Sequence, residues 1–194
     1  MTWADLIAEV RAQIDVDDDQ AYEWLLDRAR VMNAAAAWLL KEYALTLTQG
    51  TTEYPLPDDA VRTEALIVGG RPYARSTLTQ MDQARYGSST KPIYADGVDG
   101  QGANLLALWP SASGDAILRY LSDVPDDRTG SPPFPEDVHR GLSDGAIGIG
   151  LARMDERFDG AGYFDARFAD ATARLRTRRH GHVGRGGVPI RITR

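Results

Sequence analysis

The sequence predicts an α+β protein: an α-helical bundle with an inserted small antiparallel β subdomain and an extended C-terminal tail. Apolar residues recur every three or four positions near both ends of the chain, but they alternate in short segments between them. The charge also changes sign, because acidic residues dominate the body and arginines the C-terminus. We expect helical halves over residues 1–46 and 132–180, the β subdomain over 47–131, and the tail over 181–194.

The first helical half should contain two helices. Thr2 followed by Asp5 forms a capping-box pattern, which begins the first helix. The acidic cluster Asp15–Asp19 ends this helix and caps the next one. That second helix is predicted to run from the last of these aspartates to about Tyr43 and to be the longest element. Within it, Ala34–Ala37 offers a close-packing surface for another helix.

The middle of the chain has the pattern of strands. Two hairpins are predicted, one around Gln49-Gly50 and one over Glu64–Tyr73 with its turn at Gly69-Gly70. Thr77–Tyr86 has the pattern of a short helix closed by Gly87. Three further strands are expected: Lys91–Ala95, Leu105–Trp109 and Ala116–Leu121. Strands at this spacing, separated by Gly and Pro, favour a small antiparallel sheet or a sandwich.

Helical periodicity returns at Pro135, which suits a first helical position. One helix is predicted over about Glu136–Phe158 and a final one over about Tyr163–Arg179. The first of these contains four glycines: Gly141, Gly145, Gly148 and Gly150. Because glycine costs a helix about 1 kcal/mol relative to alanine, we expect these positions to contact another helix closely.

Composition excludes several classes of protein. The 194 residues include no cysteine, which excludes disulfides, thiolate metal sites and cysteine nucleophiles. No apolar run approaches the roughly 20 residues that span a bilayer, and the N-terminus lacks the pattern of a signal peptide. These features are typical of an intracellular protein, and we expect no membrane partner.

The charge is unevenly distributed. Residues 174–194 contain seven arginines and no acid, out of 22 Lys+Arg and 28 Asp+Glu in the whole chain. Subtracting the seven leaves 15 basic against 28 acidic residues in 1–173, a formal charge of −13. Such asymmetry is typical of an interaction tail on an acidic body. The tail is predicted to bind either nucleic acid or an acidic surface on a neighbouring subunit.

The end of the tail also has the pattern of a strand. Three aliphatic residues alternate with others behind the glycine-rich stretch at 181–187, and a purely electrostatic tail would not need this alternation. A strand that docks on a partner explains both features, and a strand packed on its own domain is the other interpretation. The predicted partner-docking residues are Arg185, Val188, Ile190, Arg191, Ile192 and Arg194.

No residue pattern indicates catalysis, a metal or a cofactor. His180 and His182 offer two metal ligands, but no third ligand is apparent nearby, so a solvated basic segment is the preferred interpretation. Ser143 lies in a Gly-x-Ser-x-Gly sequence, Gly141–Gly145, but this falls inside a predicted helix and not at the strand-to-helix turn of a nucleophile elbow. The glycines at 97–102 precede neither Gly-Lys-Ser/Thr nor a helix that would hold a phosphate. We therefore predict a protein that is not an enzyme, with no catalytic residue, metal or cofactor.

A series of short motifs runs through nearly the whole chain. In order they are Tyr43-Ala-Leu-Thr-Leu, Gly50-x-x-x-Tyr54-Pro-Leu-Pro-Asp, Glu64-Ala-Leu-Ile-Val-Gly-Gly-Arg-Pro-Tyr, Met81-Asp-x-x-Arg85, Lys91-Pro-Ile-Tyr94, Leu105-Leu-Ala-Leu-Trp-Pro110 and Leu118-Arg-Tyr-Leu-Ser-Asp-Val-Pro125. A Phe-Pro-Glu-Asp entry to a helix pair rich in small residues follows. In this order of features the sequence resembles the head–tail adaptor (connector) proteins of tailed bacteriophages that carry a β insertion in a helical bundle. The long Arg-rich C-terminal extension departs from that pattern.

The resemblance implies a ring of subunits, commonly twelve, bound beneath the portal protein after DNA packaging. Such a ring retains DNA and provides the platform for a downstream tail or stopper protein. It lies in the virion neck and is made in the host cytoplasm. DNA passes through its channel without sequence recognition, and an acidic body can line that channel without gripping the polyanion.

Two other functions remain open at the level of sequence. One is a nucleic-acid-binding module that uses the Arg-rich tail, for which a salt-dependent shift of duplex DNA would be the sign. The other is a carbohydrate or small-ligand hydrolase built on the β region. That function would need a deep pocket with two converging carboxylates.

Overall fold

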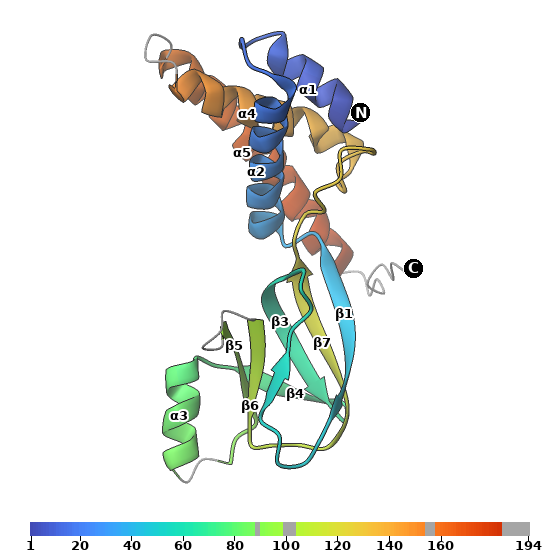
Figure 1. The fold of residues 1–194 in the computed structure, drawn as a ribbon, viewed down its shortest axis with the longest axis vertical. Helices are drawn as coiled ribbons and strands as arrows, with labels where there is room; N and C mark the ends of the chain where they lie inside the picture. Colours follow the sequence, from blue (N-terminus) through green and yellow to red (C-terminus); the bar gives the residue numbers. More distant parts are fainter. Residues whose placement is uncertain (88–89, 99–103, 154–157, 184–194) are drawn as a thin grey trace. The chain divides into compact units, whose positions relative to one another are not determined.

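The computed structural model describes residues 1–87, 90–98, 104–153 and 158–183 (Figure 1). They form a mixed α+β protein, which confirms the predicted class. The chain divides into two compact units. The helical unit contains Met1–Leu39 and the described residues from Val124 onward, and the sheet unit contains Leu40–Asp123.

The helical unit begins with α1 (Trp3–Arg11) and α2 (Asp18–Ala36). The capping box at the start of α1 is confirmed: Thr2 accepts a hydrogen bond from the Asp5 N–H, and the Asp5 carboxylate accepts one from the Thr2 N–H. The apolar faces of both helices are buried in one core. Its largest fully buried side chains include Trp3 and Tyr22, whose rings meet edge to face at 5.4 Å.

The predicted extension of the second helix to Tyr43 is wrong. The helix ends because Ala37 adopts the left-handed conformation, with φ 46° and ψ 51°. The Leu39 N–H then donates to Oδ1 of Asn33, over 2.9 Å, in place of a helical carbonyl. Beyond this point the chain is strand β1 (Leu40–Leu47). Of the expected close-packing surface at 34–37, only Ala36 and Ala37 are buried.

The C-terminal helices are η1 (Glu136–Val138), α4 (His139–Arg153) and α5 (Phe158–Val183). The helix predicted over 136–158 is thus confirmed as α4 up to Arg153, after a short 3-10 turn, and residues 154–157 lie outside the described part of the chain. With 26 residues α5 is longer than α2, which has 19, so the prediction that the second helix is the longest is also wrong. Gly160 and Gly162, which fall between the two predicted helices, lie inside α5. A Cβ on Gly160 would come within 3.3 Å of Leu151, so glycine lets α4 and α5 approach here.

The glycines of α4 confirm the expected close helix contact. A Cβ on Gly141 would overlap the Cβ of Ala171 on α5, and one on Gly145 would lie 2.7 Å from the ring of Phe168. These are distances that real Cβ atoms do not adopt, so a larger residue would push the two helices apart. Gly150 makes a similarly close approach to Ile14 and Trp24.

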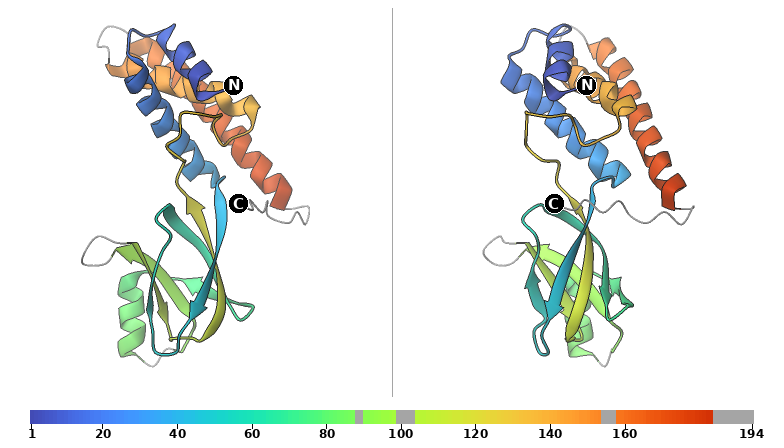
Figure 2. Two further views of the ribbon diagram at one scale, coloured as in Figure 1. Left: turned by 45° about the vertical axis from the view of Figure 1, so that its right-hand side comes forward. Right: turned by 90° about the vertical axis from the view of Figure 1, so that its right-hand side faces the viewer.

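The sheet unit contains seven strands in the order β1-β7-β3-β4-β5-β6-β2. The remaining strands are β2 (Glu53–Pro55), β3 (Ala60–Val68), β4 (Arg71–Arg75), β5 (Ile93–Val98), β6 (Asn104–Trp109) and β7 (Gly114–Ser122). The two views of Figure 2 show that the sheet is curled. The expectation of a purely antiparallel sheet is wrong in one place, because β4 and β5 run parallel.

Two hairpins were expected, and one of them forms. Strands β3 and β4 pair across Gly69-Gly70, whose φ values of 54° and 78° explain the two glycines. The hairpin predicted around Gln49-Gly50 is wrong, because β1 pairs with β7 and β2 with β6. The three later strands are confirmed, each within a few residues of its predicted range.

The core of the sheet unit lies on one face of the curled strands. It is built from side chains such as Leu66, Leu106, Leu108 and Leu118, all fully buried. The predicted helix after the second hairpin is confirmed as α3 (Leu78–Tyr86), with Thr77 as its N-cap and Gly87 as its C-cap. It packs on β5 and β6 through a small separate cluster formed by Met81, Ala95 and Ala107.

Candidate partner-docking surfaces

The predicted docking residues Arg185, Val188, Ile190, Arg191, Ile192 and Arg194 lie outside the described residues. The part of the basic segment that is described belongs to a helix. The extended tail was expected from residue 181, but α5 continues to Val183. Between Phe158 and Pro189 the sequence has no proline that would stop the helix earlier.

The arginines on α5 serve the helical unit. Arg178 pairs with Asp137 at 2.7 Å, and Arg174 pairs with Asp170, one turn before it. Arg179 donates to the carbonyl oxygen of Ala36, over 3.2 Å, near the C-terminal end of α2. Lys and Arg side chains satisfy the last carbonyls of a helix in this way. Charge counting alone could not separate these structural arginines from those of the tail.

Strand β1 forms one edge of the sheet. All eight of its residues pair with β7, from Leu40 opposite Leu121 to Leu47 opposite Gly114, without a register shift. In an antiparallel pair, the backbone groups of alternate residues point away from the partner strand. Among the described residues, no backbone group bonds to this outer side of β1. An edge of this kind is a template for another strand.

An apolar row crosses the face of the sheet opposite its core. Cross-strand pairing places one residue from each of four strands in this row: Ala44, Ile117, Ile67 and Pro72. Ile117 is 43% exposed, an unusual value for isoleucine. Beside the row, Arg119 of β7 pairs with Glu42 of β1. The sequence could not reveal this outer apolar row, because its members come from segments far apart in the chain.

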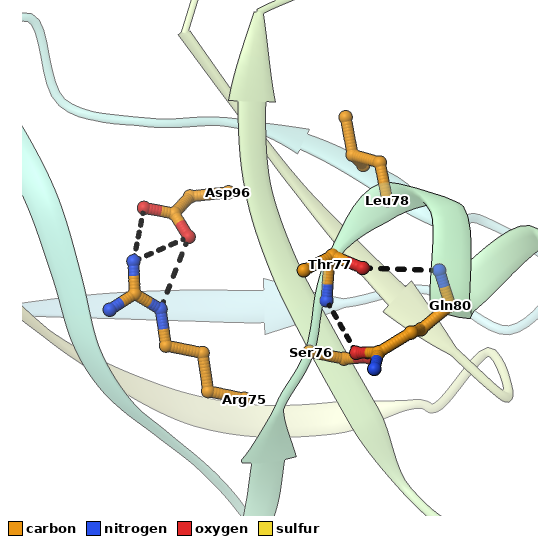
Figure 3. A pocket seen from close by; sticks show the side chains of 6 residues that line it. All are labelled: Arg75, Ser76, Thr77, Leu78, Gln80 and Asp96. Carbon is orange, nitrogen blue, oxygen red and sulfur yellow. Dashed lines mark hydrogen bonds and ion pairs between the residues drawn. The ribbon is translucent and has the colours of Figure 1, made fainter.

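An open hollow of about 620 Å³ lies where β4 leads into α3. Figure 3 shows Asp96 facing the guanidinium group of Arg75, while Gln80 and Thr77 close the first turn of α3. Burial alone would raise the pKa of Asp96, but hydrogen bonds from Arg75 and from the Thr63 N–H outweigh it and hold the pKa below 3.8. Among the described residues that line the hollow, Asp96 is the one carboxylate, and it is already paired. These residues do not supply the two converging carboxylates that a glycosidase needs.

A buried acid, Asp144, lies in the helical unit and was not singled out from the sequence. Burial raises the pKa of Asp144, although Arg167 is nearby and acts in the opposite direction. Arg167 Nε lies 3.1 Å from the Asp144 carboxylate and links α5 to α4. Ser143, the residue before Asp144, donates a hydrogen bond to the Glu9 carboxylate on α1 over 2.7 Å. These pairs join the helices of the unit, which is a structural task.

The comparison with known families decides the identity of the chain. The family model described as SU10 adaptor protein matches residues 1–191. The chain belongs to the SU10 adaptor protein family. This confirms the resemblance to phage head–tail adaptors. No curated protein matches the sequence.

The family match extends over both units and into the C-terminal segment. It includes Arg185, Val188, Ile190 and Arg191, and it ends before Ile192 and Arg194. In the described part of this SU10 adaptor family member, no helix is long and apolar enough to cross a membrane. No cluster of three or more His, Asp or Glu side chains suited to a metal ion occurs within those residues either.

Proposed function

We propose that this chain is the structural head-to-tail adaptor of a tailed phage, forming a ring of twelve copies under the portal protein. In the virion neck the ring retains the packaged DNA and holds a downstream tail or stopper protein. The family match over residues 1–191 carries this proposal. We also infer that the helical unit is a bundle into which the sheet unit is inserted, because helices precede and follow the strands in the chain.

The charge of the body supports a channel that DNA can slide through. Residues 1–173 have 28 acidic and 15 basic side chains, and many of the basic ones are held in ion pairs, such as Arg28 with Asp165 and Arg75 with Asp96. Binding to DNA depends on cations that replace its counterions. A body with few free cations has no strong hold on the backbone, so DNA passes without sequence recognition.

The C-terminal segment is proposed to dock the subunit within this assembly. Its arginines suit an acidic groove, and its three alternating aliphatic residues suit an added strand. The same arginines were the reason to consider a nucleic-acid-binding module. That alternative is weakened because Arg174, Arg178 and Arg179 are engaged within the helical unit.

A conditional stop codon in the gene of this protein tests the role directly. We expect heads that package DNA, lose it and carry no tail. Normal infectious particles, or heads that never package DNA, would overturn the proposal. A salt-dependent shift of duplex DNA by the purified protein would instead favour the nucleic-acid-binding alternative.

A further inference from the structure

We propose that the outer edge of β1 accepts the C-terminal segment Val188–Arg194 of a neighbouring copy as an added strand. This inference rests on the proposed ring and names the contact that joins its subunits. Its starting point is the edge itself. Natural proteins usually protect an edge strand with a bulge, a proline or a very short length. Strand β1 is eight residues long, has no proline and pairs with β7 without a bulge.

The one lysine of β1, Lys41, does not protect this edge from pairing with another strand. Lys41 pairs with Asp59, and the same carboxylate accepts a hydrogen bond from the hydroxyl of Tyr120. Burial alone would raise the pKa of Asp59, but hydrogen bonds from Lys41 and Tyr120 and the charge of Lys41 outweigh it and hold the pKa below its ordinary value. The ammonium group, on a side chain that is 40% exposed, is thus bound to a carboxylate of the sheet unit and is not free to shield the outer backbone groups of β1.

The two faces of β1 differ in chemistry. Leu45 and Leu47 point into the core of the sheet unit, and Tyr43 lies on the same face but is 41% exposed. The opposite face presents Glu42, Ala44 and Thr46. A strand added at this edge would continue both faces, because its side chains alternate in the same way.

The C-terminal segment matches this division. Val188, Ile190 and Ile192 share one side of an extended chain, and Arg191 and Thr193 share the other. Paired with β1, the aliphatic side would cover Tyr43, and Arg191 would lie on the face that carries the Glu42 carboxylate. The segment has seven residues and is about as long as β1, which has eight. Its only proline, Pro189, is next to the first residue, where a missing N–H matters least.

A neighbouring copy is the donor that a ring requires. A contact between identical patches closes as a dimer, whereas a ring needs two different patches on every subunit. The β1 edge and the C-terminal segment are two such patches on one chain. Each copy would donate one strand and accept one, so every contact around the ring would be the same.

Because the chain has no cysteine, single cysteines report this contact cleanly. One variant carries Thr46→Cys on β1 and a second, with an affinity tag, carries Thr193→Cys. The two are mixed, assembled with the phage's portal protein and treated with a short bis-maleimide. We expect a covalent dimer that joins residue 46 of one variant to residue 193 of the other. The control mixture replaces Thr46→Cys with Thr79→Cys, at an exposed threonine on α3. It should give at least about tenfold less covalent dimer.

The outcomes separate this contact from the ring itself. A ring that forms without the 46–193 link, or with residue 193 linked to portal, would overturn the strand exchange and leave the proposed function intact. A third variant that carries both cysteines on one chain is the control for folding back. If the 46–193 link forms only in that variant, the segment folds back on its own subunit. If no ring forms but the mixed link appears, the strand exchange stands and the ring fails. If neither appears, both are wrong.

Discussion

Arg119 on β7 donates a hydrogen bond from Nε to Oε1 of Glu42 on β1, over 2.8 Å. The pair lies next to Ala44 and Ile117, two members of the outer apolar row. The side chains of Arg119 and Glu42 are both about half exposed. Solvent screens such pairs, so we expect a double-mutant cycle with Glu42→Ala and Arg119→Ala to give a coupling of about 0.2–1 kcal/mol. Urea denaturation of the four proteins measures it. A coupling above about 2 kcal/mol would mean that the pair holds β1 in the sheet.

The close contact of α4 and α5 predicts opposite effects for two similar substitutions. Gly141→Ala should lower the free energy of unfolding by about 1–3 kcal/mol, because the added methyl group meets Ala171. Gly162→Ala is the matched control on α5, where a Cβ would meet nothing within 4 Å. It should be neutral or raise stability by up to about 1 kcal/mol, since alanine favours the helix. Equal effects in denaturant titrations would contradict the packing described.

The lowered pKa of Asp96 predicts a loss of stability in acid. A carboxylate whose folded pKa lies below its unfolded value of 3.8 stabilises the fold fully above that value, and the contribution is lost as the pH falls through the folded pKa. Asp96→Asn should cost about 1–3 kcal/mol at pH 7 and flatten the fall in melting temperature below pH 4.

Asp82→Asn is the matched control for this prediction, because Asp82 makes only an exposed pair with Arg85 within α3. It should change stability by less than about 0.5 kcal/mol. If the melting temperatures of both variants followed the same pH profile, Asp96 would not be the group responsible.

Truncation after Gly187 should leave the folded subunit intact and abolish its docking. The removed segment has no large aromatic anchor, so its loss is expected to leave the melting temperature within about 2 °C of the full chain. Binding to portal, measured by co-sedimentation, should be lost. A large drop in melting temperature would show that the segment is a strand of its own subunit, and unchanged binding would remove it from the mechanism.

Local signals in the sequence were sufficient for several elements. The capping residues Thr2 and Thr77 act within one helical turn, and Gly69-Gly70 meets the need for positive φ in a tight turn. Such features depend on neighbouring residues only. For the same reason the glycine-rich face of α4 was predictable, although its partner helix was not.

The errors arise where a pattern fits two structures or where pairing is distant. Leu39, Leu40 and Tyr43 fit the helical period, but a left-handed alanine, which no sequence rule signals, ends α2 before them. Turn residues at 49–50 indicated a hairpin, yet their flanking strands find partners at least 50 positions away. The outer apolar row and the position of β1 at one edge of the sheet follow from that distant pairing, so they could not be predicted.

The most direct test of the proposed adaptor is the mass of the particles it forms with and without portal. An acidic body repels its own copies, so the free protein should be a monomer of 21.3 kDa or a loose oligomer at micromolar concentration. Added portal should order it into one complex with a fixed number of copies, which light scattering and native mass spectrometry would detect. A stable dodecamer of the protein alone would contradict this order of assembly. A protein that stays monomeric with portal present would contradict the adaptor function itself.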